Sequence, residues 1–215
     1  MYEGGCGVAL AFLEAHRHLK DDSDADAATR AGCSIAAAIP SVEHASLYFG
    51  LTGIAFTLCA IDAVLSDART KAAPTQALEL VRSQFDGVRW NSAFELLAGN
   101  AGIAPGALAC GDSELALLAV EPYLRTAEVT DHGVQWEDRV GEPSRLHHIS
   151  HGTLGIVAAL ATQRRPPEDK RSYLTAPACR FAISCFWKTN RMMISGATPM
   201  IVPARYSPTD WMLLW

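Results

Sequence analysis

Hydrophobic residues along the chain fall into four apolar segments, and each is followed by a segment in which apolar and polar residues alternate with helical spacing. The apolar segments cover residues 7–19 and 54–65, and two more begin at Gly102 and Gly152. The segments that follow them cover residues 24–39, 74–85, 113–126 and 169–187. Apolar residues that recur every three or four positions predict helices. The pattern therefore predicts four helix pairs, each with one apolar and one amphipathic helix.

A short glycine motif opens each apolar segment and repeats at a nearly regular spacing. It reads Gly-x-x-Gly followed by Ile or Val, and its first glycines are Gly4, Gly50, Gly99 and Gly152. The steps between these glycines are 46, 49 and 53 residues. A period in this range is typical of repeat proteins, in which neighbouring units must stack because one unit cannot bury its apolar face alone. The sequence predicts an all-α fold, a partial α/α toroid with the apolar helices inside and the amphipathic helices outside.

The repeats also suggest where the domain ends. We expect a partial α/α barrel over residues 2–190 and an irregular tail over residues 191–215, where three prolines exclude a long helix. The first motif begins as early as Tyr2, and the chain closes on the apolar residues 211–215. We therefore expect a truncated toroid that can self-associate through its open barrel edges.

Two features of the connecting segments bear on the site. In the glycine turns, we expect the first glycine to take a positive φ and the second to allow close contact between helices. A nucleotide-binding glycine loop is not expected, because no strand pattern precedes the glycines. Residues 131–145, which include Asp131, Gly133 and several charged residues, predict a loop between the third and fourth pairs.

Composition and charge narrow the classes of partner and compartment. The chain has 215 residues, 49% of them hydrophobic and 19% charged, which is typical of a globular protein. Its net charge of −5 and the lack of a basic run exclude a nucleic-acid partner. No apolar run reaches the roughly 20 residues that span a bilayer, and residues 1–4 lack a basic signal region. We expect a cytoplasmic protein whose six scattered cysteines are buried thiols.

Two residues beside the glycine motifs are candidates for proton-transfer chemistry. His151 immediately precedes Gly152, and an imidazole gives and takes protons near neutral pH. Glu95 lies four residues before Gly99, where its carboxylate could orient His151 or exchange protons with it. The alternative for Glu95 is a capping or surface role.

Three further histidines lie near this segment. His147 and His151 would share one face of a helix and could form a metal-binding pair. However, the glycine at position 152 favours a turn at this point, which disfavours such a pair. We interpret His148 and His132 as surface residues.

Four stretches of the chain resemble the lanthionine synthetase C-like family, which includes the cyclases of lanthipeptide biosynthesis. The matching stretches are YEGGCGVAL at 2–10, SLYFGLTGIA at 46–55, ELLAGNAGI at 95–103 and SHGTLGI at 150–156. The resemblance implies a double ring of helices and a zinc-dependent addition of peptide cysteine thiols to dehydroamino acids. It also implies that His151 is the catalytic histidine, and it places Glu95 where cyclases of the family carry an acidic residue, usually Asp.

The family's zinc ligands lie in two later motifs, Trp-Cys-x-Gly and Cys-His-Gly, and neither occurs in this sequence. The two cysteines after the fourth motif, Cys179 and Cys185, have no adjacent glycine or histidine. We therefore expect the chain to be the amino-terminal part of a family member, truncated before the zinc-ligand motifs. It should have no cofactor, no metal ligands and no activity alone.

Three hypotheses about function remain open at this point. The first is a cyclase-family protein with His151 as acid and base, acting on a precursor peptide. The second is a non-catalytic peptide-binding or truncated remnant protein of the same fold. The third is an α/α-toroid enzyme that acts on sugars, but such enzymes use two carboxylates and Glu95 is the one candidate acid that we identify.

Overall fold

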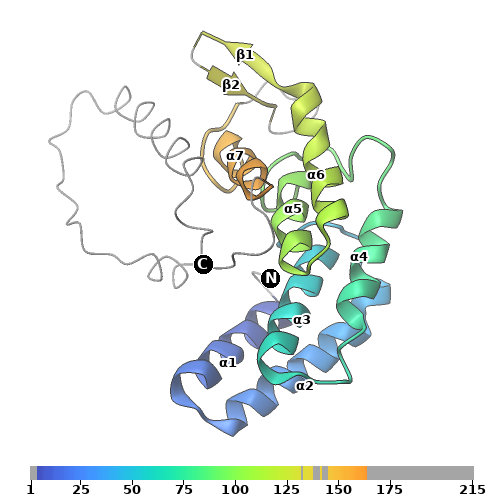
Figure 1. The fold of residues 1–215 in the computed structure, drawn as a ribbon, viewed down its shortest axis with the longest axis vertical. Coiled ribbons are helices and arrows are strands. Elements are labelled where there is room, and N and C mark those ends of the chain that lie inside the picture. Colours follow the sequence, from blue (N-terminus) through green and yellow to red (C-terminus); the bar gives the residue numbers. More distant parts are fainter. Residues whose placement is uncertain (1–3, 132, 138–140, 142–144, 164–215) are drawn as a thin grey trace, which may run out of the picture. The chain divides into compact units, whose positions relative to one another are not determined.

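The computed structural model describes residues 4–131, 133–137, 141 and 145–163, so the predicted helix at 169–187 and the tail at 191–215 lie outside the described residues. The described part contains seven α-helices, one short 3₁₀ helix and a two-stranded sheet (Figure 1). In chain order these are α1 (Gly5–Leu19), α2 (Asp22–Ala38), η1 (Ile39–Ser41), α3 (Leu51–Leu65), α4 (Ala73–Ser83), α5 (Asn100–Ala109), α6 (Ser113–Thr126), β1 (Glu128–Thr130), β2 (Gly133–Gln135) and α7 (Thr153–Thr162).

The helices pack as the repeat pattern predicts. α1 contacts α2, α3 contacts α4, and α5 contacts α6, which gives three consecutive helix pairs. The first helix of each pair also contacts the first helix of the next, because α3 lies against both α1 and α5, and α5 lies against α7. The predicted all-α fold, with stacked helix pairs as in part of an α/α toroid, is confirmed.

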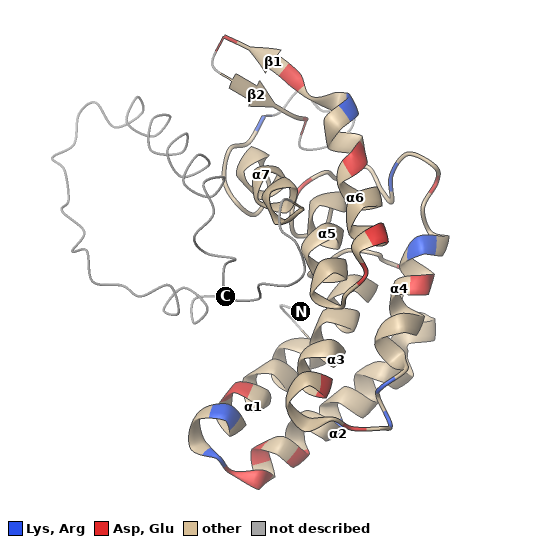
Figure 2. Ribbon diagram, viewed as in Figure 1, with Lys and Arg blue, Asp and Glu red and all other residues tan. Residues whose placement is uncertain are grey.

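The hydrophobic core is formed mainly by the apolar helices. α3 contributes eight buried residues, which are Leu51, Thr52, Gly53, Ile54, Ala55, Thr57, Leu58 and Ile61. α5 and α7 carry no charged side chain, and Figure 2 shows both ribbons without a charged position. Burial of such surface contributes about 25 cal/mol per Å² of apolar area. Among the described residues, no helix combines the length and the apolar character that a membrane crossing requires.

The segment between the third pair and α7 differs from the predicted loop. β1 and β2 form an antiparallel hairpin in which Val129 pairs with Val134. Gly133 opens β2 with a φ of 125°, a conformation that a residue with a Cβ rarely adopts. The guanidinium Nη2 of Arg145 lies 3.0 Å from Oε1 of Glu128 and 3.5 Å from Oε1 of Glu137. Arg145 therefore links this hairpin to the loop that enters α7.

Candidate functional site

The glycine turns share one backbone geometry, which differs from the expected one. Gly4, Gly50, Gly99 and Gly152 are the N-cap residues of α1, α3, α5 and α7, and all four are extended, with φ between −99° and −159°. The expectation of a positive φ at the first glycine is therefore wrong. Gly50, Gly99 and Gly152 are required for another reason, because a Cβ at these positions would collide with neighbouring backbone atoms.

At those three turns the chain folds back against the N-cap residue. The first N–H of each helix donates to a carbonyl seven residues earlier, at 2.7 Å from Leu51 to His44, 3.4 Å from Asn100 to Ala93 and 3.0 Å from Thr153 to Leu146. A Cβ on Gly50 would lie 2.6 Å from the carbonyl carbon of His44 and 2.8 Å from the nitrogen of Ser46. A side chain does not fit there, whatever the backbone angles.

Backbone contacts place these three turns side by side. The N–H of Tyr48 donates to the carbonyl of Leu97 at 3.1 Å, and the N–H of Leu96 donates to the carbonyl of Ser150 at 3.2 Å. The second glycine of the fourth motif, Gly155, packs against the neighbouring turn, since a Cβ on it would lie 3.0 Å from the Cβ of Leu96. The turns at Gly50, Gly99 and Gly152 are therefore clustered together.

Glu95 is held inside the third turn. The residue is 6% exposed, and its two carboxylate oxygens accept the N–H groups of Leu97 at 2.6 Å and Ala98 at 2.7 Å. A carboxylate that accepts backbone N–H groups is fixed in position and resists rotation. Glu95 is therefore a capping residue, as the alternative interpretation had it, and its carboxylate also faces the next turn.

His151 comes from that next turn and meets the same carboxylate. Its Nδ1 lies 3.4 Å from Oε2 of Glu95, and its side chain is 52% exposed whereas that of Glu95 is 8% exposed. The two residues singled out from the sequence are thus brought together by the Leu96–Ser150 backbone bond. Because Nδ1 faces the carboxylate, the other ring nitrogen, Nε2, is left for a bound molecule.

A cluster of aromatic side chains packs against the turn that carries Glu95. The sequence pattern did not identify these residues as part of the site. Tyr123 of α6 is fully buried and donates its hydroxyl to the carbonyl of Phe94, the residue before Glu95. Its ring packs edge-on against Phe94 and Trp136, with centroids 5.6 Å and 6.3 Å away. The indole N–H of Trp136 donates to the carbonyl of Tyr123 at 2.8 Å. Tyr123 of α6 and Trp136, which follows β2, therefore hold the turn that carries Glu95 in place.

Burial raises the pKa of the Tyr123 phenol well above its usual value, and the nearby Glu95 charge raises it further. The unfolded chain releases this proton near pH 10 whereas the folded chain keeps it. The stability contributed by neutral Tyr123 is therefore complete below pH 10 and falls as the pH rises above it. We expect Tyr123→Phe to lower the free energy of unfolding at pH 7 by about 1–2 kcal/mol. Above pH 10, the loss of stability with rising pH should be less steep in this variant, by the equivalent of roughly one proton released on unfolding.

Denaturant unfolding of both proteins at several pH values between 7 and 11 would measure this difference. If the free energy of unfolding fell equally steeply with pH above pH 10 in wild type and Tyr123→Phe, Tyr123 would not be the group that causes this loss of stability.

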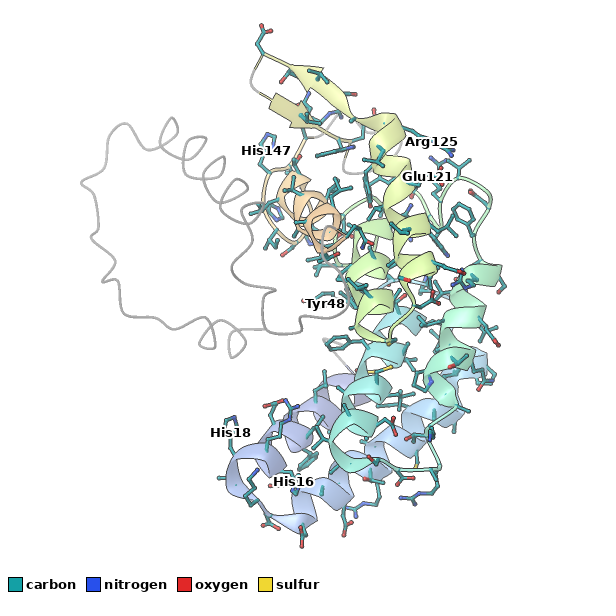
Figure 3. All side chains as sticks on the ribbon, viewed as in Figure 1. His16, His18, Tyr48, Glu121, Arg125 and His147 are labelled. Atoms are coloured by element: carbon teal, nitrogen blue, oxygen red, sulfur yellow. The ribbon has the colours of Figure 1, made fainter. Side chains whose placement is uncertain are left out.

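The neighbouring histidines lie on a turn, and a helical metal pair is not formed. His148 and His151 are in a bend and a turn, and both are exposed, as is His147. Figure 3 shows His147 on the loop between β2 and α7. His148 is more than a surface residue, because its Nδ1 accepts the N–H of His151 at 3.3 Å and its ring lies 5.6 Å from the His151 ring. His132 lies outside the described residues.

Comparison with protein families and with curated proteins gives one clear result. No curated protein matches the chain. The family model described as lanthionine synthetase C-like protein matches residues 1–173, which include all four glycine motifs and both candidate residues. The chain therefore belongs to the lanthionine synthetase C-like family.

Proposed function

We propose that the protein acts on a modified precursor peptide, in which it promotes the addition of a cysteine thiol to a dehydroamino acid, with His151 as the proton-transfer group. The observation that carries this proposal is the contact between the half-exposed His151 and the buried Glu95, two residues from adjacent repeats. Membership of the lanthionine synthetase C-like family supports the reaction class.

The chemistry requires one proton to move. The peptide sulfur forms a bond to the β-carbon of the dehydroamino acid, and the proton from the thiol is finally placed on the α-carbon. Nε2 of His151 can accept the thiol proton and deliver it to that carbon. Glu95 accepts from Nδ1–H, which keeps the ring in one orientation and stabilises it while it carries both protons.

Zinc, which the family resemblance implies, does not fit the described residues. Among residues 4–131, 133–137, 141 and 145–163, no three His, Cys, Asp or Glu side chains come together in an arrangement that could hold a metal ion. Three or four protein ligands are needed for a zinc site. The proposal therefore assigns no step to a metal.

A synthetic peptide with one cysteine and one dehydroalanine tests the proposal, because its free thiol disappears on ring closure. The missing zinc motifs led us to expect no activity of the chain alone, but the contact between His151 and Glu95 changes that expectation. We expect the full chain to close the ring faster than buffer alone, as followed by thiol alkylation and mass spectrometry. His151→Asn should lower the protein-dependent rate by roughly 100-fold or more. His147→Asn is the matched control, because His147 is an exposed histidine of the same loop, and should leave the rate unchanged.

An equal rate with and without protein would overturn the catalytic proposal. The second hypothesis, a non-catalytic peptide-binding protein, is favoured by the lack of a metal-binding cluster in the described part. It predicts that the same peptide binds in isothermal titration without any acceleration of ring closure.

A further inference from the structure

The turn that carries His151 contains a second histidine, to which the proposed reaction assigns no role. Nδ1 of His148 accepts the backbone N–H of His151 at 3.3 Å. The two imidazole rings also pack edge-on, with an interplanar angle of 89° and centroids 5.6 Å apart. Because the backbone N–H is the donor, Nδ1 of His148 is unprotonated in this conformation, and the neutral ring carries its proton on Nε2.

His148 occupies the same position in its repeat as Glu95 does in the preceding one. Each lies four residues before the first glycine of its motif. The carboxylate of Glu95 accepts the N–H of Ala98, the residue directly before that glycine, at 2.7 Å. His148 likewise accepts the N–H of the residue directly before the glycine, which in this turn is His151. The two turns therefore share one side-chain-to-backbone bond, and in the fourth turn the residue that it holds is His151.

This bond restrains a residue that lies at the surface. The side chain of His151 is 52% exposed, and its Nδ1 lies 3.4 Å from Oε2 of Glu95. A half-exposed side chain on a turn loses conformational freedom when it is held in one orientation, and misplacement of a reacting group by about 1 Å can cost roughly 100-fold in rate. Glu95 holds the imidazole, whereas His148 holds the backbone from which the imidazole extends. The two contacts thus fix His151 at both ends of its side chain.

We infer that His148 is a positioning residue for His151 and acts through the hydrogen bond that its Nδ1 accepts. Its effect on the reaction rests on the proposed function, whereas its hold on His151 does not. Two substitutions separate the bond from the ring contact. Phenylalanine at position 148 keeps a ring that can pack against His151 but has no acceptor for the N–H. Asparagine lacks the ring, but its side-chain oxygen can accept the same N–H.

The ring-closure assay on the full chain compares these variants. We expect His148→Phe to lower kcat roughly 10-fold with KM unchanged, because the peptide still binds but His151 is less well placed. His148→Asn should restore most of the lost rate. His147→Phe is the matched control, since it makes the same substitution at the neighbouring exposed histidine, and should behave as the wild type. An unchanged rate in His148→Phe, or an equal loss in both His148 variants, would overturn the inference.

Amide hydrogen exchange, measured by NMR on the full chain, tests the same bond without the reaction. The backbone N–H of His151 should exchange roughly 3- to 10-fold faster in His148→Phe than in the wild type or in His148→Asn. If the protein does not accelerate ring closure, the proposed function fails, and the exchange rates still decide whether His148 holds His151. Equal exchange of this N–H in all three proteins would overturn the inference, whatever the ring-closure rates.

Discussion

Gly50→Ala is expected to lower the free energy of unfolding by about 2–3 kcal/mol, whereas Gly4→Ala should change it by about 0.5 kcal/mol or less. The two glycines occupy the same position of the repeat, since each is the N-cap of an apolar helix. They also share an extended backbone, with φ of −145° at Gly50 and −159° at Gly4. Differences in backbone preference therefore cancel between the two variants.

What differs between them is the space around the missing Cβ. At Gly50 the new methyl group would meet the backbone of His44 and Ser46, and those atoms belong to the same tight turn. Backbone atoms cannot move aside as a flexible side chain can, so the turn must open and its hydrogen bonds must lengthen. At Gly4 no described heavy atom lies within 4 Å of the position that a Cβ would take. The extra methyl group should be tolerated there.

Urea unfolding followed by circular dichroism at 222 nm measures both variants against the wild type. Because both changes replace glycine with alanine at a helix N-cap, the loss of cap preference is the same in each. Equal destabilisation of the two variants would show that N-cap chemistry decides the cost, and would contradict the steric explanation. Gly152→Ala should resemble Gly50→Ala, since its Cβ would lie 2.7 Å from the nitrogen of His147.

The fold class could be predicted from the sequence because both of its signals are local and repeated. Helical periodicity fixes which face of each segment is apolar, and four glycine motifs at a similar spacing indicate stacking of equivalent units. The role of the first glycine was predicted wrongly, because sequence cannot distinguish a positive φ from a lack of room for a Cβ. The β1–β2 hairpin was missed because its strands have only three residues each and no alternating apolar pattern.

The site could be predicted in part. His151 and Glu95 stood out because each lies beside a glycine motif, and repeats place equivalent positions at the same end. Tyr123 could not be identified in this way, since it is one apolar position among many on α6, and its contact with Phe94 depends on how α6 packs. The contact between His148 and His151 likewise depends on the conformation of the turn, which the sequence alone does not define.

Glu95 has two roles in the structure, and they can be separated by combining two substitutions. In Glu95→Gln, one carboxylate oxygen becomes an NH₂ group that cannot accept a backbone N–H. One of the bonds from Leu97 and Ala98 is then lost in a buried place, which should cost about 1–3 kcal/mol of stability. The same change removes the negative charge that faces His151, so the proposed ring-closure rate should fall roughly 10- to 100-fold. His151→Asn should lower the rate further but change the stability by about 0.5 kcal/mol or less, because its side chain is half exposed.

The double variant decides whether Glu95 acts through His151. If the carboxylate serves the reaction only by holding the imidazole, Glu95→Gln should have almost no additional effect on the rate once His151 is asparagine. Its cost in stability should remain, because one backbone N–H of the turn, from Leu97 or Ala98, still lacks an acceptor. The wild type, the two single variants and the double variant are compared in the peptide assay and in urea unfolding. The rates give the coupling of Glu95 and His151 in the reaction, and the unfolding free energies give their coupling in stability. A rate loss of equal size in the two backgrounds would show that Glu95 acts independently of His151, and the pair would then not be the unit that transfers the proton.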